Sequence, residues 1–227
     1  EEVDRTVLVV GGGVTGLTAA LDSAAAGYDV VLIEKADQLG GWMSKWAKGI
    51  PHKAPYTEPQ ALDIAEQIAA VQASERITVH TGAIIEKIDG IPGQFDVNLK
   101  GNASAPFKAG AIVQATGWQP YDATKLAHLG YGASPDVITN VQMEEMLASG
   151  AITRPSDGQT PKRIAFIQCA GSRDQDHLPY CSGVCCRVSI KQALMIRDMA
   201  PDAEAYVLYK DIRSPGQYED FYQRAQE

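Results

Sequence analysis

Three features are missing from the sequence, and each absence excludes a class of protein. The longest apolar runs have the length of a strand, well short of the roughly 20 residues that cross a membrane, so no direct membrane span is expected. Lysines and arginines form no run, and the formal net charge is −8, which argues against a nucleic-acid partner. No secretory signal opens the chain, so we expect a cytoplasmic protein. The 227 residues are 45% apolar, which is enough for a sizeable core.

A glycine-rich turn organises the first half of the chain. Residues 6–10 form a continuous run of β-favouring side chains, which predicts a buried strand. Gly11, Gly13 and Gly16 follow as G-x-G-x-x-G and open a helix predicted over 14–26. The first glycine permits the tight turn, the second lets a pyrophosphate approach the backbone, and the third lets the helix pack close to the strand. The N–H groups and the positive dipole at the helix start favour such an anion without any lysine.

A second strand is predicted over 29–33, and Glu34 ends it. A carboxylate there can accept hydrogen bonds from both hydroxyls of a ribose and would repel a 2′-phosphate. The spacing continues to Gly40 and Gly41, and as a whole it resembles the extended fingerprint of flavoproteins of the glutathione and thioredoxin reductase type. In that family the bound dinucleotide is FAD, and the trailing glycine pair lies along its ribityl and pyrophosphate portion. The alternative is a glycine-rich turn in an unrelated α/β domain.

The predicted elements that follow complete this domain. Thr57 and Gln60 resemble a capping box, so a helix should follow them. Short strands that form a small antiparallel meander, which interrupts the parallel sheet, are predicted over 76–81, 83–88 and 94–100. A further strand over 109–115 runs into Thr116 and Gly117. The resulting Ala-Thr-Gly lets the backbone approach the cofactor again, and the same flavoprotein family carries a similar tripeptide at this place.

The second half begins after a break in composition near Gly158, which divides the chain into predicted domains of residues 1–158 and 159–227. A short helix before the break is predicted over 141–148, capped by Thr139. Strands and helices alternate again after it, over 163–168, 184–199, 205–210 and 218 to the end. No second G-x-G-x-x-G follows this restart. The order of the elements predicts an α/β fold, with a Rossmann-like domain and a second, partial βαβα unit. The resemblance to the flavoproteins implies that the first domain binds FAD and that the fold is thioredoxin-reductase-like.

All four cysteines of the chain lie within eighteen residues. Cys169 ends a predicted strand, and Cys181, Cys185 and Cys186 stand at the start of the next helix, so sulfur lines the crevice between them. Four converging thiolates suit a [4Fe-4S] cluster. Its negative charge would be offset by the helix start and by nearby cations, namely Arg173, Arg187 and Lys191. The alternatives are zinc, for which adjacent Cys185 and Cys186 are awkward, a dithiol redox pair, although no C-x-x-C is present, and four buried free thiols.

The cysteine order C-x11-C-x3-C-C carries a second resemblance, together with the segments FIQCAGSRD, PYCSGVCC, SIKQALMIRD and YKDIRSPGQYEDFYQRAQE. These residues resemble the A subunit of heterodisulfide reductases and the related B subunit of quinone-interacting membrane-bound oxidoreductase complexes. The stretch GGWMSKWAKGIPHKAPYTEPQ looks more like the second of these. The resemblance implies an FAD-dependent oxidoreductase subunit with an iron–sulfur centre. It would exchange electrons with other iron–sulfur subunits and associate with a membrane only indirectly, through a membrane subunit.

The resemblance also implies which residues hold the two cofactors. The cluster ligands would be Cys169, Cys181, Cys185 and Cys186. The FAD contacts would be Gly11, Gly13, Val14, Thr15, Gly16, Glu34, Lys35, Gly40, Gly41, Trp42, Thr116 and Gly117. These groups are ligands rather than acids or bases, so no catalytic side chain is predicted. Each of the four histidines is expected to be a structural or surface residue.

Two other functions compete with this interpretation. One is a pyridine-nucleotide-disulfide reductase that acts through Cys185 or Cys186, and the other is an assembly domain that binds no cofactor. The sequence also lacks the ferredoxin-like runs C-x2-C-x2-C-x3-C that members of the family usually carry, and it opens without an initiator methionine. We therefore expect a fragment of a longer protein that lacks turnover on its own.

Overall fold

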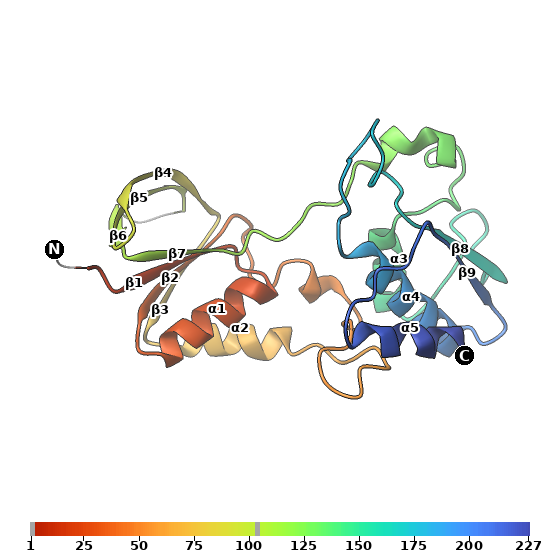
Figure 1. Ribbon diagram of the computed structural model, residues 1–227, viewed down its shortest axis with the longest axis horizontal. Helices are drawn as coiled ribbons and strands as arrows, with labels where there is room; N and C mark the ends of the chain where they lie inside the picture. The colour runs from red at the N-terminus through yellow and green to blue at the C-terminus, as the bar shows by residue number, and fades with distance from the viewer. Residues whose placement is uncertain (1–2, 103–104) are drawn as a thin grey trace. The chain divides into compact units, whose positions relative to one another are not determined.

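The computed structural model describes residues 3–102 and 105–227 (Figure 1). Contacts between residues divide the chain into two compact units. Unit 1 comprises Glu1–Ser44 and Asp63–Trp118, and unit 2 comprises Lys45–Leu62 and Gln119–Glu227. The chain passes from unit 1 into unit 2 for the last time after Trp118. The predicted domain boundary near Gly158 stays a prediction.

Unit 1 is built on a parallel sheet in the order β3-β2-β1-β7. Its strands are β1 (Thr6–Val10), β2 (Asp29–Glu34), β3 (Ile77–Thr81) and β7 (Ala111–Gln114). Helices α1 (Val14–Ala25) and α2 (Ile64–Ala73) lie along one face of the sheet (Figure 1). Val9, Val30 and Leu32 are fully or almost fully buried in this unit, so the apolar runs read from the sequence form buried strands.

A small antiparallel sheet covers the other face of the parallel sheet (Figure 1). It consists of β4 (Ala83–Ile91), β5 (Gln94–Gly101) and β6 (Phe107–Ala109). Leu8 and Ile33 pack against Val97 and Ala109, because alternate residues of β1 and β2 point to this side. The predicted meander beside a parallel sheet is therefore confirmed, although the first strand of the three-strand set, residues 77–81, belongs to the parallel sheet instead.

The capping box predicted at Thr57 is wrong. Helix α2 begins only at Ile64. Gln60 instead holds the loop before it: its side-chain amide donates to the carbonyl of Lys53 at 2.7 Å, and its Oε1 accepts from the N–H of His52 at 3.0 Å. Here the glutamine three residues after a threonine holds a loop. Sequence spacing alone does not distinguish this role from that of a helix cap.

Unit 2 contains the predicted alternation of strands and helices. Its elements are η2 (Ala123–Leu129), α3 (Asn140–Ser149), β8 (Arg163–Ile167), α4 (Cys185–Met199), β9 (Glu204–Leu208) and α5 (Tyr218–Gln226). Strands β8 and β9 are parallel, with Arg163 paired to Glu204. Thr139 caps α3 as predicted, in a full capping box with Gln142.

Helix α4 is the central element of unit 2. Ile196 and its neighbours pack toward α3 and the β8–β9 pair, where Phe166 and Leu147 are buried. Ile190 and Leu194 pack in a second cluster around Phe221 of α5, which is fully buried. Because both sides of α4 are covered, every residue over 188–196 is buried.

A buried ion pair joins three segments of unit 2. Lys191 of α4 is fully buried, and its Nζ lies 2.6 Å from Oε1 of Glu144 on α3. The same Nζ donates to the carbonyl of Lys48 at 2.9 Å and lies 3.9 Å from the ring centroid of Trp46. Burial lowers the pKa of Lys191, and Glu144 opposes this change. Lys191 therefore ties the segment 45–62 to α3 and α4.

We predict that Lys191→Met lowers the free energy of unfolding by about 3–5 kcal/mol, because it leaves the Glu144 carboxylate buried without its cation. Urea denaturation followed by circular dichroism measures this change. The exposed pair of Arg224 and Glu58 provides the control: Arg224→Gln should cost less than about 1 kcal/mol. A Lys191→Met chain as stable as the parent would contradict the prediction.

Candidate functional site

Two close backbone contacts shape the glycine turn of unit 1. A Cβ on Gly11, whose φ is +108°, would lie 2.3 Å from the carbonyl oxygen of Ala115. A Cβ on Gly16 would lie 1.7 Å from the carbonyl oxygen of Gly11. Both neighbours are backbone atoms, which cannot rotate away as a side chain could. The first and third glycines therefore have the steric roles that the sequence predicted for them.

Gly13 differs from these two, because the space beside it is open. A Cβ there would have only one neighbour within 4 Å, the Cα of Gly41 at 3.9 Å. Gly13 is also the N-cap of α1 and carries no side-chain cap. The first N–H to bond back along the helix is that of Leu17, to the Gly13 carbonyl at 2.9 Å. The N–H groups of Val14, Thr15 and Gly16 precede this bond, at the positive end of the helix dipole.

Glu34 is buried at the end of β2 and braces the turn. Its Oε2 accepts from the N–H of Gly12 at 2.7 Å, and its Oε1 accepts from the N–H of Ala36 at 2.8 Å. A carboxylate oxygen can accept more than one hydrogen bond, so the predicted contact with ribose hydroxyls remains open to it. The bracing role was not predicted from the sequence. The neighbouring Lys35 is exposed.

The structure brings the other predicted FAD residues to the same turn. The N–H of Gly40 donates to the Gly12 carbonyl at 2.8 Å, and Gly41 follows with its Cα close to Gly13. Thr116 lies two residues beyond the end of β7, and its Cα would lie 3.3 Å from a Cβ on Gly11. Segments far apart in the sequence thus meet at the carboxyl ends of β1 and β7, where parallel sheets bind dinucleotides.

Trp42 is in contact with a tryptophan that was not predicted to be a site residue. Its ring stacks on that of Trp118, with centroids 5.2 Å apart and planes at 17°. Its Nε1–H donates to the carbonyl of Trp118 at 3.0 Å. Trp118 comes directly after Thr116 and Gly117, which were predicted to contact the cofactor. This position was the one sequence signal that could have indicated Trp118 as a site residue.

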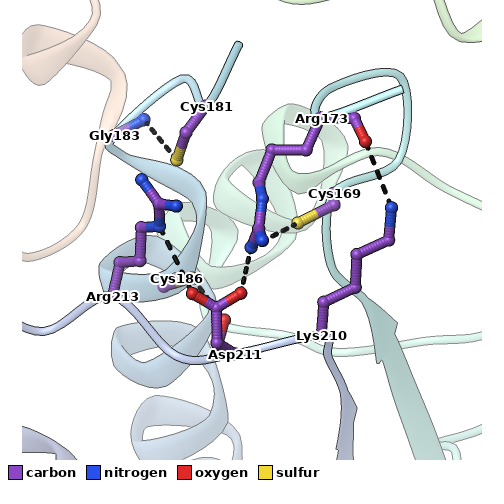
Figure 2. Close-up of polar contacts among 8 residues, drawn as sticks. All are labelled: Cys169, Arg173, Cys181, Gly183, Cys186, Lys210, Asp211 and Arg213. Atoms are coloured by element: carbon purple, nitrogen blue, oxygen red, sulfur yellow. Dashed lines mark hydrogen bonds and ion pairs between the residues drawn. The ribbon is translucent and has the colours of Figure 1, made fainter. Parts of the chain in front are cut away.

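The four cysteines of unit 2 all carry free thiols. Cys169 follows β8 with a φ of +57°, and its Sγ lies 3.9 Å from Nη1 of Arg173 (Figure 2). The Arg173 guanidinium also binds the carboxylate of Asp211, and Arg213 approaches that carboxylate from the other side. Lys210 donates to the carbonyl of Arg173 at 3.1 Å. The Cys169 loop is therefore tied through Arg173 to Asp211 and to Lys210, and Arg213 is a second cation beside Asp211.

Cys186 is the buried member of the thiol group. Its Sγ lies 4.0 Å from the carbonyl oxygen of Asp211 (Figure 2). Burial raises the pKa of its thiol, a backbone contact with Arg213 opposes this, and the nearby Cys185 and Cys169 raise it further.

The remaining contacts of the thiols are local. The N–H of Gly183 approaches Sγ of Cys181 at 3.3 Å, and the hydroxyl of Ser182 lies 3.5 Å from Sγ of Cys185. Among residues 3–102 and 105–227, no three His, Cys, Asp or Glu side chains are placed to hold one metal ion. The donor set has the right chemistry for an iron–sulfur cluster, but Cys169 and Cys181 are turned toward their own loops.

The cations near the thiols differ in part from those expected. Arg173 lies beside Cys169 as predicted, and Arg187 donates to the carbonyl of Gly183 at 2.7 Å. Lys191 does not face the thiols, because its charge is paired with Glu144. Lys210 and Arg213, which were not predicted, stand in the surroundings of Cys169 and Cys186 instead (Figure 2).

One histidine of the cysteine segment has a specific partner. The Tyr121 hydroxyl and Nδ1 of His177 are 2.7 Å apart, and the two rings meet edge to face. A Cβ on Gly171 would lie 2.4 Å from the Tyr121 ring, so this tyrosine packs directly on the loop after Cys169. His177 thus has a tyrosine partner, and its structural role stays a prediction.

None of the helices in the described parts of the chain has both the length and the apolar character needed to cross a membrane.

Residues 6–88 match the family model described as FAD dependent oxidoreductase. The whole chain is 31% identical to the A subunit of the H(2)/formate:CoB-CoM heterodisulfide,ferredoxin reductase of Methanococcus maripaludis, and it covers 46% of that protein. It is also 31% identical, over 99% of its length, to an iron-sulfur A subunit of the CoB--CoM heterodisulfide reductase of Methanopyrus kandleri, again covering 46%. The chain thus spans slightly less than half the length of these curated relatives.

The chain is also similar in fold to the solved thioredoxin reductase of T. acidophilum. The TM-score is 0.53 at 15% identity, and the match covers 97% of this chain and 62% of that one. Identity at this level shows the fold alone. The predicted α/β, thioredoxin-reductase-like fold class is confirmed.

We predict that Gly16→Ala lowers the free energy of unfolding by more than about 3 kcal/mol, or prevents folding, because its methyl group would collide with the Gly11 carbonyl. Gly13→Ala is the matched control in the same turn, and the open space there limits its cost to about 1 kcal/mol at the helix cap. Urea denaturation of both variants tests the pair. Equal losses of stability would contradict the steric account of the turn.

Proposed function

We propose that this chain, a relative of the A subunit of heterodisulfide reductases along its whole length, is a flavin and iron–sulfur electron-transfer module of an oxidoreductase complex. The relationship to this A subunit predicted from the sequence is confirmed, and so is its class as an FAD-dependent oxidoreductase. The closer likeness to the B subunit of quinone-interacting complexes stays a prediction. We place the protein in the cytoplasm, with membrane association only through a membrane subunit.

The observation that carries the FAD assignment is the open glycine at the start of α1. Gly13 is free of close neighbours on its Cβ side, so a pyrophosphate could reach the backbone there. The N–H groups of Val14, Thr15 and Gly16 would donate to its oxygens, and the positive end of α1 would favour its charge. Glu34 lies at the end of the adjacent strand, where it would accept from the ribose hydroxyls.

When bound, FAD supplies the chemistry of hydride and single-electron transfer. The protein's own groups bind and orient it. Gly40 and Gly41 would line its central portion, because the Gly40 N–H bond to Gly12 fixes them beside the turn. Thr116 and Gly117 would border it from the end of β7. We assign no general acid or base to this site.

For the cluster we propose Cys169, Cys181, Cys185 and Cys186 as ligands. The support is the donor set: four free thiols, on the loop after β8 and at or just before the start of α4. Ligation would turn Cys169 from Arg173 and Cys181 from the Gly183 N–H. The cationic surroundings of Arg173, Lys210 and Arg213 would stabilise the negative charge of a thiolate-bound cluster.

The names of the relatives support a partner class. They are called subunits of CoB-CoM heterodisulfide reductases, and several of the names include ferredoxin. We propose that this chain passes electrons to and from other iron–sulfur subunits of such a complex. Because the chain spans less than half of those relatives, we propose electron relay alone and do not assign it their substrates.

The structure gives an argument against each of the two competing functions. A disulfide reductase would act through Cys185 or Cys186, and Cys186 fits that role poorly, because its thiol is buried and its raised pKa makes the reactive thiolate scarce. A cofactor-free assembly domain would remain colourless when iron, sulfide and FAD are supplied without oxygen. The open site at Gly13 favours the cofactor-binding function over this alternative.

We predict that Gly13→Ala raises the Kd for FAD about tenfold or more, since a methyl group would stand where the pyrophosphate approaches. Isothermal titration measures the affinity. Gly27→Ala, beyond the other end of α1, is the control: its positive φ of +90° makes the variant less stable, but its Kd for FAD should be unchanged. An unchanged Kd in Gly13→Ala would refute this placement of the pyrophosphate.

We predict that anaerobic reconstitution with iron and sulfide loads about four iron atoms per chain and protects the four thiols from alkylation. Cys186→Ser should lose most of this iron, whereas Ser182→Ala, beside Cys185, should keep it. Iron and sulfide analysis with thiol counting checks both. Tight binding of one zinc ion instead, with no iron retained, would replace the cluster by a zinc site.

A further inference from the structure

Two of the three tryptophans of the chain form a stacked pair in unit 1. Trp42 and Trp118 are 76 residues apart in the sequence, and they are joined by both the ring stack and the Nε1–H bond to a carbonyl. Aromatic pairs of this offset-stacked kind hold a defined relative geometry. The pair therefore links the segment after Gly41 to the segment after Gly117.

The position of the pair follows from the glycines that precede each ring. Gly41 lies against Gly13, with its Cβ position 3.1 Å from the Gly13 Cα, and Trp42 is the next residue. Trp118 follows Gly117, just beyond the end of β7, which pairs with β1. Both tryptophans thus extend from the two segments that border the glycine turn at the carboxyl edge of the sheet.

The rings are not part of the apolar core. Trp118 is 38% exposed, and Trp42 is only partly buried. The core cluster between the two sheets is formed by other residues, around Leu8 and Val97. Large aromatic rings that stay partly open at the edge of a ligand site offer a flat apolar surface to a planar ligand. Core packing therefore does not account for the stack.

We infer that the Trp42–Trp118 stack is the aromatic wall of the flavin site, against which the isoalloxazine ring packs. The inference rests on the proposed FAD binding and extends it to the ring end of the cofactor. The glycine turn and α1 would hold the pyrophosphate, and the two indoles would select for a flat, aromatic group at the other end. Trp118 then joins the binding site as a contact residue.

Trp→Phe variants test this inference, because phenylalanine keeps an aromatic face but does not quench flavin fluorescence as an indole in contact does. The variants are Trp42→Phe, Trp118→Phe and the double variant. Trp46→Phe is the matched control, because Trp46 lies in unit 2 against Lys191. Circular dichroism of each chain without FAD first checks the stack itself: its exciton couplet should be present in the parent and the control and absent from the three variants.

FAD is then titrated into each protein, with affinity measured by calorimetry and emission by fluorescence. Flavin bound to the parent and to Trp46→Phe should be strongly quenched. Flavin bound to the double variant should emit at least about threefold more brightly, with a Kd within about threefold of the parent. Equal quenching in the parent and the double variant, with FAD bound by both, overturns the inference alone. A parent chain that binds no FAD overturns the proposed function and the inference together.

Discussion

The contact between the Gly16 backbone and the Gly11 carbonyl is the constraint on which unit 1 depends. It sets where α1 starts relative to β1, and the Glu34 carboxylate and Gly40 N–H then fix the backbone around that start. Packing alone requires glycine at these crowded positions. It does not require glycine at position 13, where the space is open. The phosphate group of the proposed FAD would account for a glycine at that position, beside its role as the cap of α1.

Ion pairs arrange the cysteine region of unit 2, whereas close backbone contacts arrange the glycine turn of unit 1. Asp211 brings Arg173 and Arg213 together beside Cys169, while its own carbonyl faces Cys186. Cys169 and Arg173 both adopt a positive φ, which is uncommon for side-chain-bearing residues and strains this turn.

Much of the fold was predictable, because the buried strands of a parallel sheet are continuous apolar runs and the turns between them are marked by glycine. The Thr139 cap was also found correctly. What the sequence could not reveal depends on partners distant along the chain. Gln60 looked like half of a capping box but binds a loop, and Lys191 looked like a cluster cation but is paired with Glu144. The stacking of Trp42 on Trp118 likewise left no periodic signal.

The buried pairing of Lys191 with Glu144 also limits how this protein can diverge. Replacing either residue alone leaves the other charge in a place without water, whereas replacing both with apolar residues of similar volume is tolerated far better in other proteins. A substitution at only one of these two positions is therefore costly, whereas a joint substitution at both is not. In proteins that share an ancestor with this one, the residues at positions 144 and 191 should covary: either an acidic residue with a basic one, or two apolar residues.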